Sequence, residues 1–150
     1  MNRKFLLCLS TLALCLLLSI PAEAARKNFH WFSIWVPEQD WTVLWSSLDK
    51  DMETVIVRKN DYSALLVVSV GGSDGLELRP YAESMRKAFN GTPVQDNGSG
   101  GYTFTFAHNQ LGRSHYVYLW GRKDDVKTYV FYGVDPVMRD IMASFRYLEE

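Results

Sequence analysis

Cysteine is almost absent from this chain of 150 residues. Its two cysteines, Cys8 and Cys15, both lie in an apolar segment at the N-terminus, so the chain after residue 24 has none. A domain without cysteine has neither disulfide bonds nor a thiol nucleophile, and its own core has to hold it together. Disulfide scaffolds and cysteine-dependent enzymes are therefore excluded.

An excess of charge of one sign is also missing. The formal net charge is -1, from 16 basic and 17 acidic residues, and the sequence has neither a basic block nor an acidic tail. Nucleic acids and anionic membranes attract proteins through clusters of positive charge. We therefore expect no nucleic-acid partner.

The N-terminal apolar run is too short for a membrane-spanning helix. It extends over 16 residues, from Phe5 to Ile20, whereas a spanning helix needs about 20. Two basic residues precede it, and Pro21 and a small residue, Ala24, follow it, which is the pattern of a secretory signal peptide. The sequence predicts a signal peptide that is cleaved after Ala24, a single domain at 25–150 without a transmembrane segment, and a periplasmic or secreted location.

Apolar and polar residues alternate along most of the remaining chain, which is typical of β-strands. We predict eight strands, at about 29–36, 41–47, 53–59, 63–71, 94–97, 102–108, 113–121 and 126–132. Apolar residues three and four positions apart predict helices at about 78–90 and 135–145. The stretch 64–68 is apolar at every position, which predicts a strand buried on both faces.

Several predicted strands carry apolar residues on both faces, so we expect helices to cover both sides of the sheet. The sequence thus predicts an α+β fold, with an antiparallel β-sheet flanked by helices in a three-layer α/β/α sandwich.

The order of these segments is similar to that of a known fold. The similarity lies in Phe32-Ser33-Ile34-Trp35-Val36-Pro37 with Trp41 shortly after, in the strand, loop and helix of 63–90, in the three-strand meander, and in a final helix ending at Ala143-Ser144-Phe145. In these features the chain resembles the PsbP-like fold, which is shared by the thylakoid extrinsic protein of the oxygen-evolving complex, a nuclear Ran-binding protein and bacterial periplasmic proteins of the DcrB type. The resemblance is mostly architectural, and it implies a non-catalytic domain of an export compartment that binds a partner or assists an assembly.

Catalytic motifs are weak. The glycine-rich stretch 71–75 lies between a strand and a helix but lacks the Gly-Lys-Ser/Thr ending and the Gly-x-Gly-x-x-Gly spacing of phosphate-binding loops, so we predict a plain connector. Ser99 lies in a glycine loop rather than in a nucleophile elbow, and Asp124 and Asp125 occupy a turn. We therefore expect neither enzyme activity nor a cofactor.

Two histidines are the candidate metal ligands. His108 and His115 flank a predicted hairpin turn and could approach each other, but no third ligand is spaced to join them. We expect surface histidines rather than a metal site.

Aromatic residues are the one excess, at 14% of the chain. The candidate binding residues are five aromatic residues of the predicted sheet: Trp31, Trp35, Tyr116, Tyr118 and Trp120. If the strands at 29–36 and 41–47 pair directly, Trp31 and Trp35 share one face and Trp41 and Trp45 share the other. One pair would then belong to the core. The other pair either packs in the core as well, which we favour, or lines a cleft for a peptide, glycan or lipid.

Together these patterns favour an exported, non-catalytic module that binds another envelope or secreted protein through sheet aromatics or an edge strand. An alternative is a carrier of a small ligand, such as a cell-wall or lipid fragment, in an aromatic-lined pocket between sheet and helix. A hydrolase is the third and weakest hypothesis.

Overall fold

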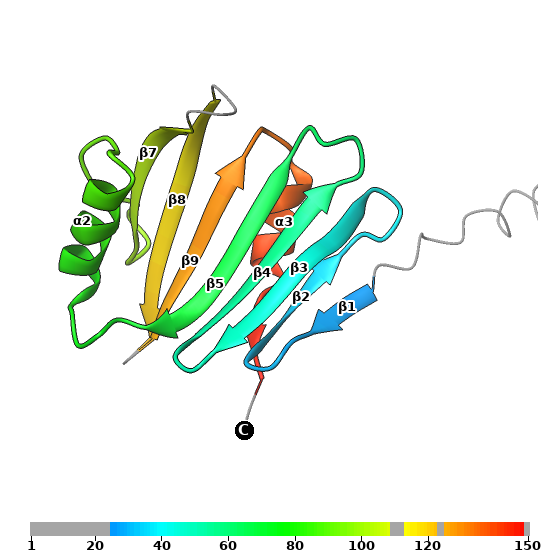
Figure 1. The fold of residues 1–150 in the computed structure, drawn as a ribbon, viewed down its shortest axis with the longest axis horizontal. Helices are drawn as coiled ribbons and strands as arrows, with labels where there is room; N and C mark the ends of the chain where they lie inside the picture. The colour runs from blue at the N-terminus through cyan, green and yellow to red at the C-terminus, as the bar shows by residue number, and fades with distance from the viewer. Residues whose placement is uncertain (1–24, 109–112, 123–124, 149–150) are drawn as a thin grey trace, which may run out of the picture.

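Antiparallel β-structure dominates the computed structural model, which describes residues 25–108, 113–122 and 125–148 (Figure 1). The large sheet has seven strands in the order β3-β4-β5-β9-β8-β7-β6. Its members are β3 (Trp41–Asp49), β4 (Met52–Lys59), β5 (Leu65–Gly72), β6 (Gln95–Asp96), β7 (Tyr102–His108), β8 (Arg113–Arg122) and β9 (Asp125–Tyr132). With two helices in its described part, α2 (Leu78–Ala88) and α3 (Val137–Ala143), the chain has the predicted α+β class.

A second, small sheet holds three strands: β1 (Ala25–Asn28), β2 (Phe32–Val36) and β10 (Arg146–Tyr147). The strand β2 pairs with β1 on one side and with β10 on the other. The hypothesis that the first two predicted strands pair directly is therefore wrong. Pro37 ends β2, and a turn in which Trp41 N–H donates to the Pro37 carbonyl leads the chain into the large sheet. Consecutive burial of Phe32, Ser33 and Ile34 shows that β2 is enclosed on both of its faces.

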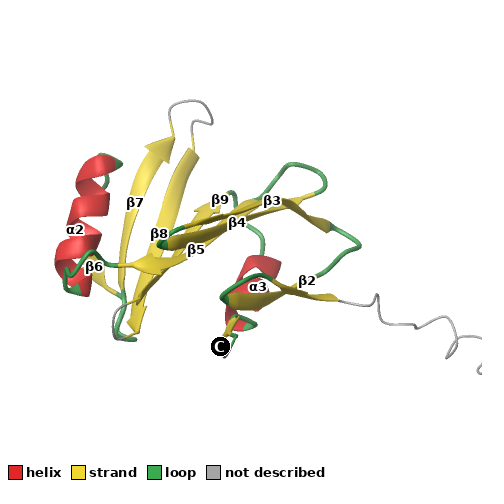
Figure 2. Ribbon diagram, turned by 60° about the horizontal axis from the view of Figure 1, so that its bottom comes forward, coloured by secondary structure: helices red, strands yellow, loops and turns green. Residues whose placement is uncertain are grey.

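The first hydrophobic core lies between the two sheets. Phe32, Ile34 and Val36 of β2 pack with buried residues of β4 and β5, and Met138 and Ile141 of α3 complete this cluster. Figure 2 shows α3 and β2 together beneath the part of the large sheet formed by β3, β4 and β5. This core joins the small sheet and α3 to one face of the large sheet.

The second core lies beneath α2. Ala82 is fully buried and packs with Phe104 and Phe106 of β7 and with Val117 and Leu119 of β8. The helix ends beside β7, where a Cβ at Gly91 would lie 2.6 Å from the Phe104 ring, so glycine permits the close approach.

The central strand β9 contributes to both cores. Tyr129 and Phe131 belong to the first core, whereas Val126 and Val130 belong to the second. Since odd and even residues of a strand point to opposite faces, α2 and α3 pack on opposite faces of the large sheet. They also contact different strands: α2 packs against β7 and β8, and Figure 1 shows it beside β7 at one end of the sheet.

Within the described residues, neither helix is long and apolar enough to cross a membrane. The predicted signal peptide at 1–24 lies outside the described residues.

Candidate functional site

One part of the large sheet has apolar side chains that no helix or strand of the described residues covers. On β4, Val55 and Val57 are buried in the first core, so the alternating residues Ile56 and Arg58 face the other side. The register places Ile56 between Trp45 of β3 and Val67 of β5, and it places Arg58 beside Leu65 of β5. We call these five residues, Trp45, Ile56, Arg58, Leu65 and Val67, the open sheet face.

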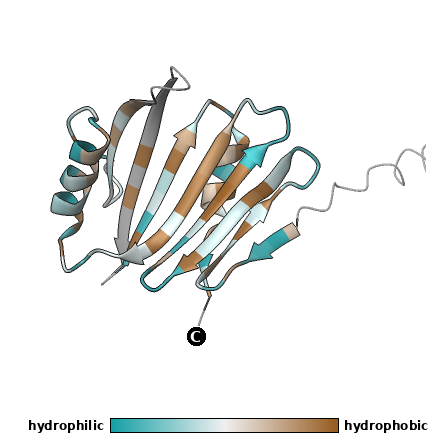
Figure 3. Cartoon of the chain, in the orientation of Figure 1, coloured by the Kyte–Doolittle hydropathy of each residue, from teal (hydrophilic) through white to brown (hydrophobic). Residues whose placement is uncertain are grey.

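The open sheet face is on the same side of the sheet as α2 but over other strands. Val67 packs at the margin of the second core, and Ile56, Leu65 and Val67 are all half-buried. The prediction that the stretch 64–68 is buried on both faces is therefore wrong for one face, because α2 lies over β7 and β8. Figure 3 shows hydrophobic residues along β5 despite this exposure.

A β-bulge brings Trp45 onto the open sheet face. Trp41 and Val43 of β3 pair with Lys59 and Val57, and Trp41 is buried in the first core. The register then shifts between Val43 and Trp45, so that Trp45 pairs with Ile56 instead of continuing on the core side. The expectation that Trp41 and Trp45 share a face is thus wrong. The side chain of Trp45 is 49% exposed, whereas Trp41 is 2% exposed.

The strand β3 is also an edge of the large sheet, since β4 is its one hydrogen-bonded neighbour among the described strands. It carries no charged residue from Trp41 to Leu48. Leu44, Trp45, Leu48 and the adjacent Met52 are large apolar residues that are exposed along this edge. Trp45 faces the open side, whereas Leu48 pairs with Glu53 and faces the other side of the sheet. Long apolar edge strands invite pairing with another chain, and exposed apolar patches mark interaction sites.

At one end of the open sheet face, Arg58 stacks on Tyr62. The guanidinium carbon lies 4.0 Å from the centre of the Tyr62 ring. Tyr62 is 72% exposed and has a φ of 64°, a left-handed conformation that is uncommon for a bulky side chain. Its N–H donates to the Lys59 carbonyl over 3.0 Å, which closes the turn between β4 and β5.

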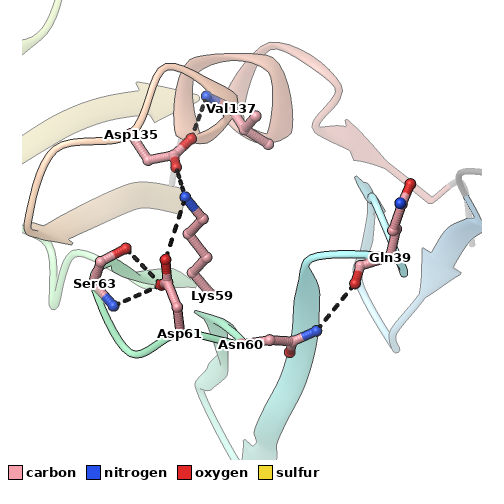
Figure 4. A network of polar contacts seen from close by, with 7 residues as sticks. All are labelled: Gln39, Lys59, Asn60, Asp61, Ser63, Asp135 and Val137. Atoms are coloured by element: carbon pink, nitrogen blue, oxygen red, sulfur yellow. Dashed lines mark hydrogen bonds and ion pairs between the residues drawn. The ribbon is translucent and has the colours of Figure 1, made fainter.

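A polar network fixes this turn to the start of α3 (Figure 4). Lys59 Nζ lies 2.7 Å from Asp135 Oδ2, and the other oxygen of Asp135 accepts the Val137 N–H over 2.9 Å. The hydrogen bond to Asp135 raises the pKa of Lys59. Asp61 accepts the N–H and hydroxyl of Ser63, and these hydrogen bonds lower the pKa of its carboxyl. The network positions the turn that carries Tyr62.

A buried carboxylate joins the two sheets. Glu53 of β4 is 4% exposed, and its two oxygens accept the N–H groups of His30 and Trp31, each over 2.7 Å. Both acceptor atoms are therefore used in holding the turn between β1 and β2 against the large sheet. These two hydrogen bonds compensate for the burial of the carboxylate, so Glu53 has a structural role.

The predicted binding tryptophans Trp31 and Trp35 lie away from the open sheet face. Both are half-buried against the first core, in and beside the small sheet. Their backbone N–H groups donate to Glu53 and to Ser144 Oγ. That these two tryptophans bind a partner or ligand stays a prediction.

The other three predicted binding residues lie on β8, in the large sheet. By register Tyr116, Tyr118 and Trp120 stand opposite Phe131, Tyr129 and Lys127 of β9. Their side chains are outside the described residues. The structure therefore separates the five predicted residues: Trp31 and Trp35 lie in and beside the small sheet, and the other three lie in the large sheet.

Lys127 of β9, the partner of Trp120 in the sheet, lies against aromatic rings. Its Nζ is 4.4 Å from the centre of the Phe145 ring and 5.7 Å from that of Tyr129. Burial lowers the pKa of the Lys127 amine. Contacts of this kind between an amine and ring faces stabilise the packing of β9 against the segment after α3.

The motifs considered for catalysis and metal binding form no assembled centre in the described part of the chain. The side chains of His108 and His115 lie outside the described residues, and elsewhere no group of three His, Cys, Asp or Glu residues could hold a metal ion. Gly71 and Gly72 belong to β5, and Ser99 lies in a turn where its N–H donates to Asn97 Oδ1. Asp124 is also outside the described residues, and Asp125 begins β9.

Comparison with known proteins supplies no relative: no protein-family model matches the chain, and no curated protein matches it.

Proposed function

We propose that this protein is a non-catalytic binding module that holds another protein on the open sheet face and the edge strand β3. The observation that carries the proposal is the exposure of Leu44, Trp45 and Leu48 on an edge strand that has no charged residue from Trp41 to Leu48. A strand from a partner can add to such an edge through backbone hydrogen bonds, and neighbouring apolar side chains give the contact its affinity. Trp45 is suited to such an anchor because it combines a large apolar ring with one donor.

The proposal includes the location and the detailed fold. The apolar run with Pro21 and Ala24 supports export to the periplasm or the exterior, where the partner would be another envelope or secreted protein. A three-layer arrangement of the PsbP-like type is supported by the packing of α2 and α3 on opposite faces. Proteins with that fold serve as binding or assembly domains, which agrees with a module that has no catalysis of its own.

The test is photocrosslinking from defined positions in the compartment where the full chain is exported. A benzophenone amino acid replaces Trp45 in one variant and Leu76 in the control, because Leu76 is similarly exposed, at 46%, but lies in the loop before α2. We expect a discrete adduct with one protein from position 45 and none from position 76. The purified pair should then bind in a Trp45-dependent way.

Equal adducts from both positions, or none from position 45, would contradict the proposal. In that case a saturable rise in melting temperature with a lipid or cell-wall fragment would favour the small-ligand carrier instead, because a ligand that binds the folded state stabilises it.

A further inference from the structure

Arg58 is a cation on an apolar surface. It is half-buried, and none of the ion pairs between described residues includes it. Its Nε is buried and has no hydrogen-bond partner among the described residues. A charged group in such a position is stabilised when an anion approaches it, and guanidinium groups bind carboxylates through two parallel hydrogen bonds.

The stacking on Tyr62 holds the guanidinium in place before any ligand arrives. The 4.0 Å separation is that of a cation–π contact, and the turn that supports Tyr62 is fixed by the Lys59–Asp135 network. Tyr62 keeps its left-handed backbone and its exposure within this well-anchored turn. Conformations of this kind persist where the surrounding structure enforces them, and they concentrate at binding sites.

The neighbours of Arg58 define what else a ligand must offer. Leu65 lies directly opposite on β5, and Ile56 lies two residues along β4 on the same face. Successive residues on one face of a strand are about 6.8 Å apart. In a ligand that binds Arg58 through a carboxylate, the group that lies about two strand residues away contacts Ile56 and Trp45. That group should therefore be apolar.

The adjacent edge strand favours an extended polypeptide as that ligand. The strand β3 runs along the open sheet face, with Thr42 beside Arg58 and Trp45 beside Ile56, and its outer side has no hydrogen-bonded neighbour among the described strands. We propose that the open sheet face binds an extended segment of another protein in which an acidic residue, or a C-terminal carboxylate, stands two positions from a large apolar residue, with Arg58 binding the carboxylate. This inference rests on the proposed function and names the chemistry of its partner.

The probe is a phage-displayed library of short random peptides, selected on the exported protein. We expect the selected peptides to share an acidic residue or free C-terminal carboxylate two positions from an aromatic or branched apolar residue. Binding of the best peptide is then measured by fluorescence anisotropy for Arg58→Gln, Arg58→Lys and Trp45→Ser. Arg79→Gln is the matched control, because Arg79 also lies over a tyrosine ring, 5.9 Å from the centre of Tyr102, but on α2.

Loss of a charge-assisted hydrogen bond weakens binding by roughly 10- to 100-fold, so we expect Arg58→Gln to raise the Kd by about that factor. Arg58→Lys keeps the charge without the planar group and should fall between Gln and wild type. Arg79→Gln should leave the Kd unchanged. Melting temperatures of the variants show whether each is folded.

Peptides that need Trp45 but show no acidic preference, with an unchanged Kd in Arg58→Gln, would overturn the inference and leave the proposed function standing. Selection of no peptide that depends on Trp45 would overturn both. Association of two copies of this chain, seen by light scattering and lost in Trp45→Ser, would assign the surface to self-association and would also overturn the inference.

Discussion

The two faces of β4 differ in how they treat charge and apolar surface. On the covered face, Val55 and Val57 are fully buried, and both charged residues have partners in the same chain: Glu53 accepts two N–H groups, and Lys59 pairs with Asp135. On the open face, Ile56 stays half-buried, and Arg58 stacks on Tyr62 without an acidic partner among the described residues. The charged groups of the covered face have partners in the chain, whereas among the described residues the open face leaves Arg58 without an acidic partner and its apolar side chains partly exposed.

This difference bears on how apolar strands are interpreted. A strand with apolar residues on both faces predicts two covering layers, because exposure of large apolar patches is costly in a monomer. In β5 the second layer is only partly supplied by the chain itself, since Val67 touches the margin of the second core. The remaining apolar surface is the basis for the proposed partner.

The largest expected effect on stability comes from two adjacent leucines of β5, which face opposite sides of the sheet. Leu66 is fully buried in the first core, and Leu65 is half-buried on the open face. Leu66→Ala should lower the free energy of unfolding by about 2–5 kcal/mol, because it removes buried methyl groups and leaves a cavity. Leu65→Ala should cost less than about 1 kcal/mol, because its surroundings are already open to water. Denaturant unfolding of both variants checks this, and equal losses would contradict the distinction between the faces.

Substitution of Glu53, the buried acid of the covered face, should have the next largest effect on stability. Glu53→Gln keeps one acceptor oxygen, so one of the two N–H groups of His30 and Trp31 loses its partner. We expect a loss of roughly 1–3 kcal/mol in the free energy of unfolding, the cost of an unsatisfied buried polar group. Amide hydrogen exchange at His30 and Trp31 should accelerate as well. Glu83→Gln, which removes a partly exposed ion pair with Arg86 on α2, should change stability by less than about 0.5 kcal/mol. Similar effects of the two substitutions would show that Glu53 does not fasten the small sheet.

Much of the fold could be predicted from the sequence because its patterns are local. Alternation along 53–59 and 126–132 predicts β4 and β9, and apolar residues three and four positions apart predict α3. The strands β1 and β10 were missed. β10 has two residues, too few for a period to be visible, and β1 directly follows the predicted signal peptide.

The candidate site depends on features that no local pattern contains. Which strand forms an edge follows from long-range pairing, so the exposure of β3 was out of reach even though its residues were predicted to form a strand. The bulge that turns Trp45 outward has no glycine or proline to mark it. The predicted strands at 53–59 and 63–71 require a turn between them, but they do not predict a left-handed Tyr62, because glycine and asparagine are the residues that usually take that conformation.

The ion pair that anchors the turn at the end of the open sheet face should have the smallest effect on stability, and that effect should depend on pH. Because the hydrogen bond to Asp135 raises the pKa of Lys59, this lysine stabilises the fold fully below its ordinary pKa of 10.5, and the contribution is lost as pH rises through the higher folded value. Asp135→Asn removes the charge while keeping an oxygen that can accept the Val137 N–H. We therefore expect the variant to lose less stability than the wild type between neutral and strongly alkaline pH, measured by denaturant unfolding at each pH. Asp140→Asn, an exposed acid on α3, should follow the wild-type curve. If Asp135→Asn also followed it, the ion pair would not anchor the turn, and the fixed position of Tyr62 beneath Arg58 would need another cause.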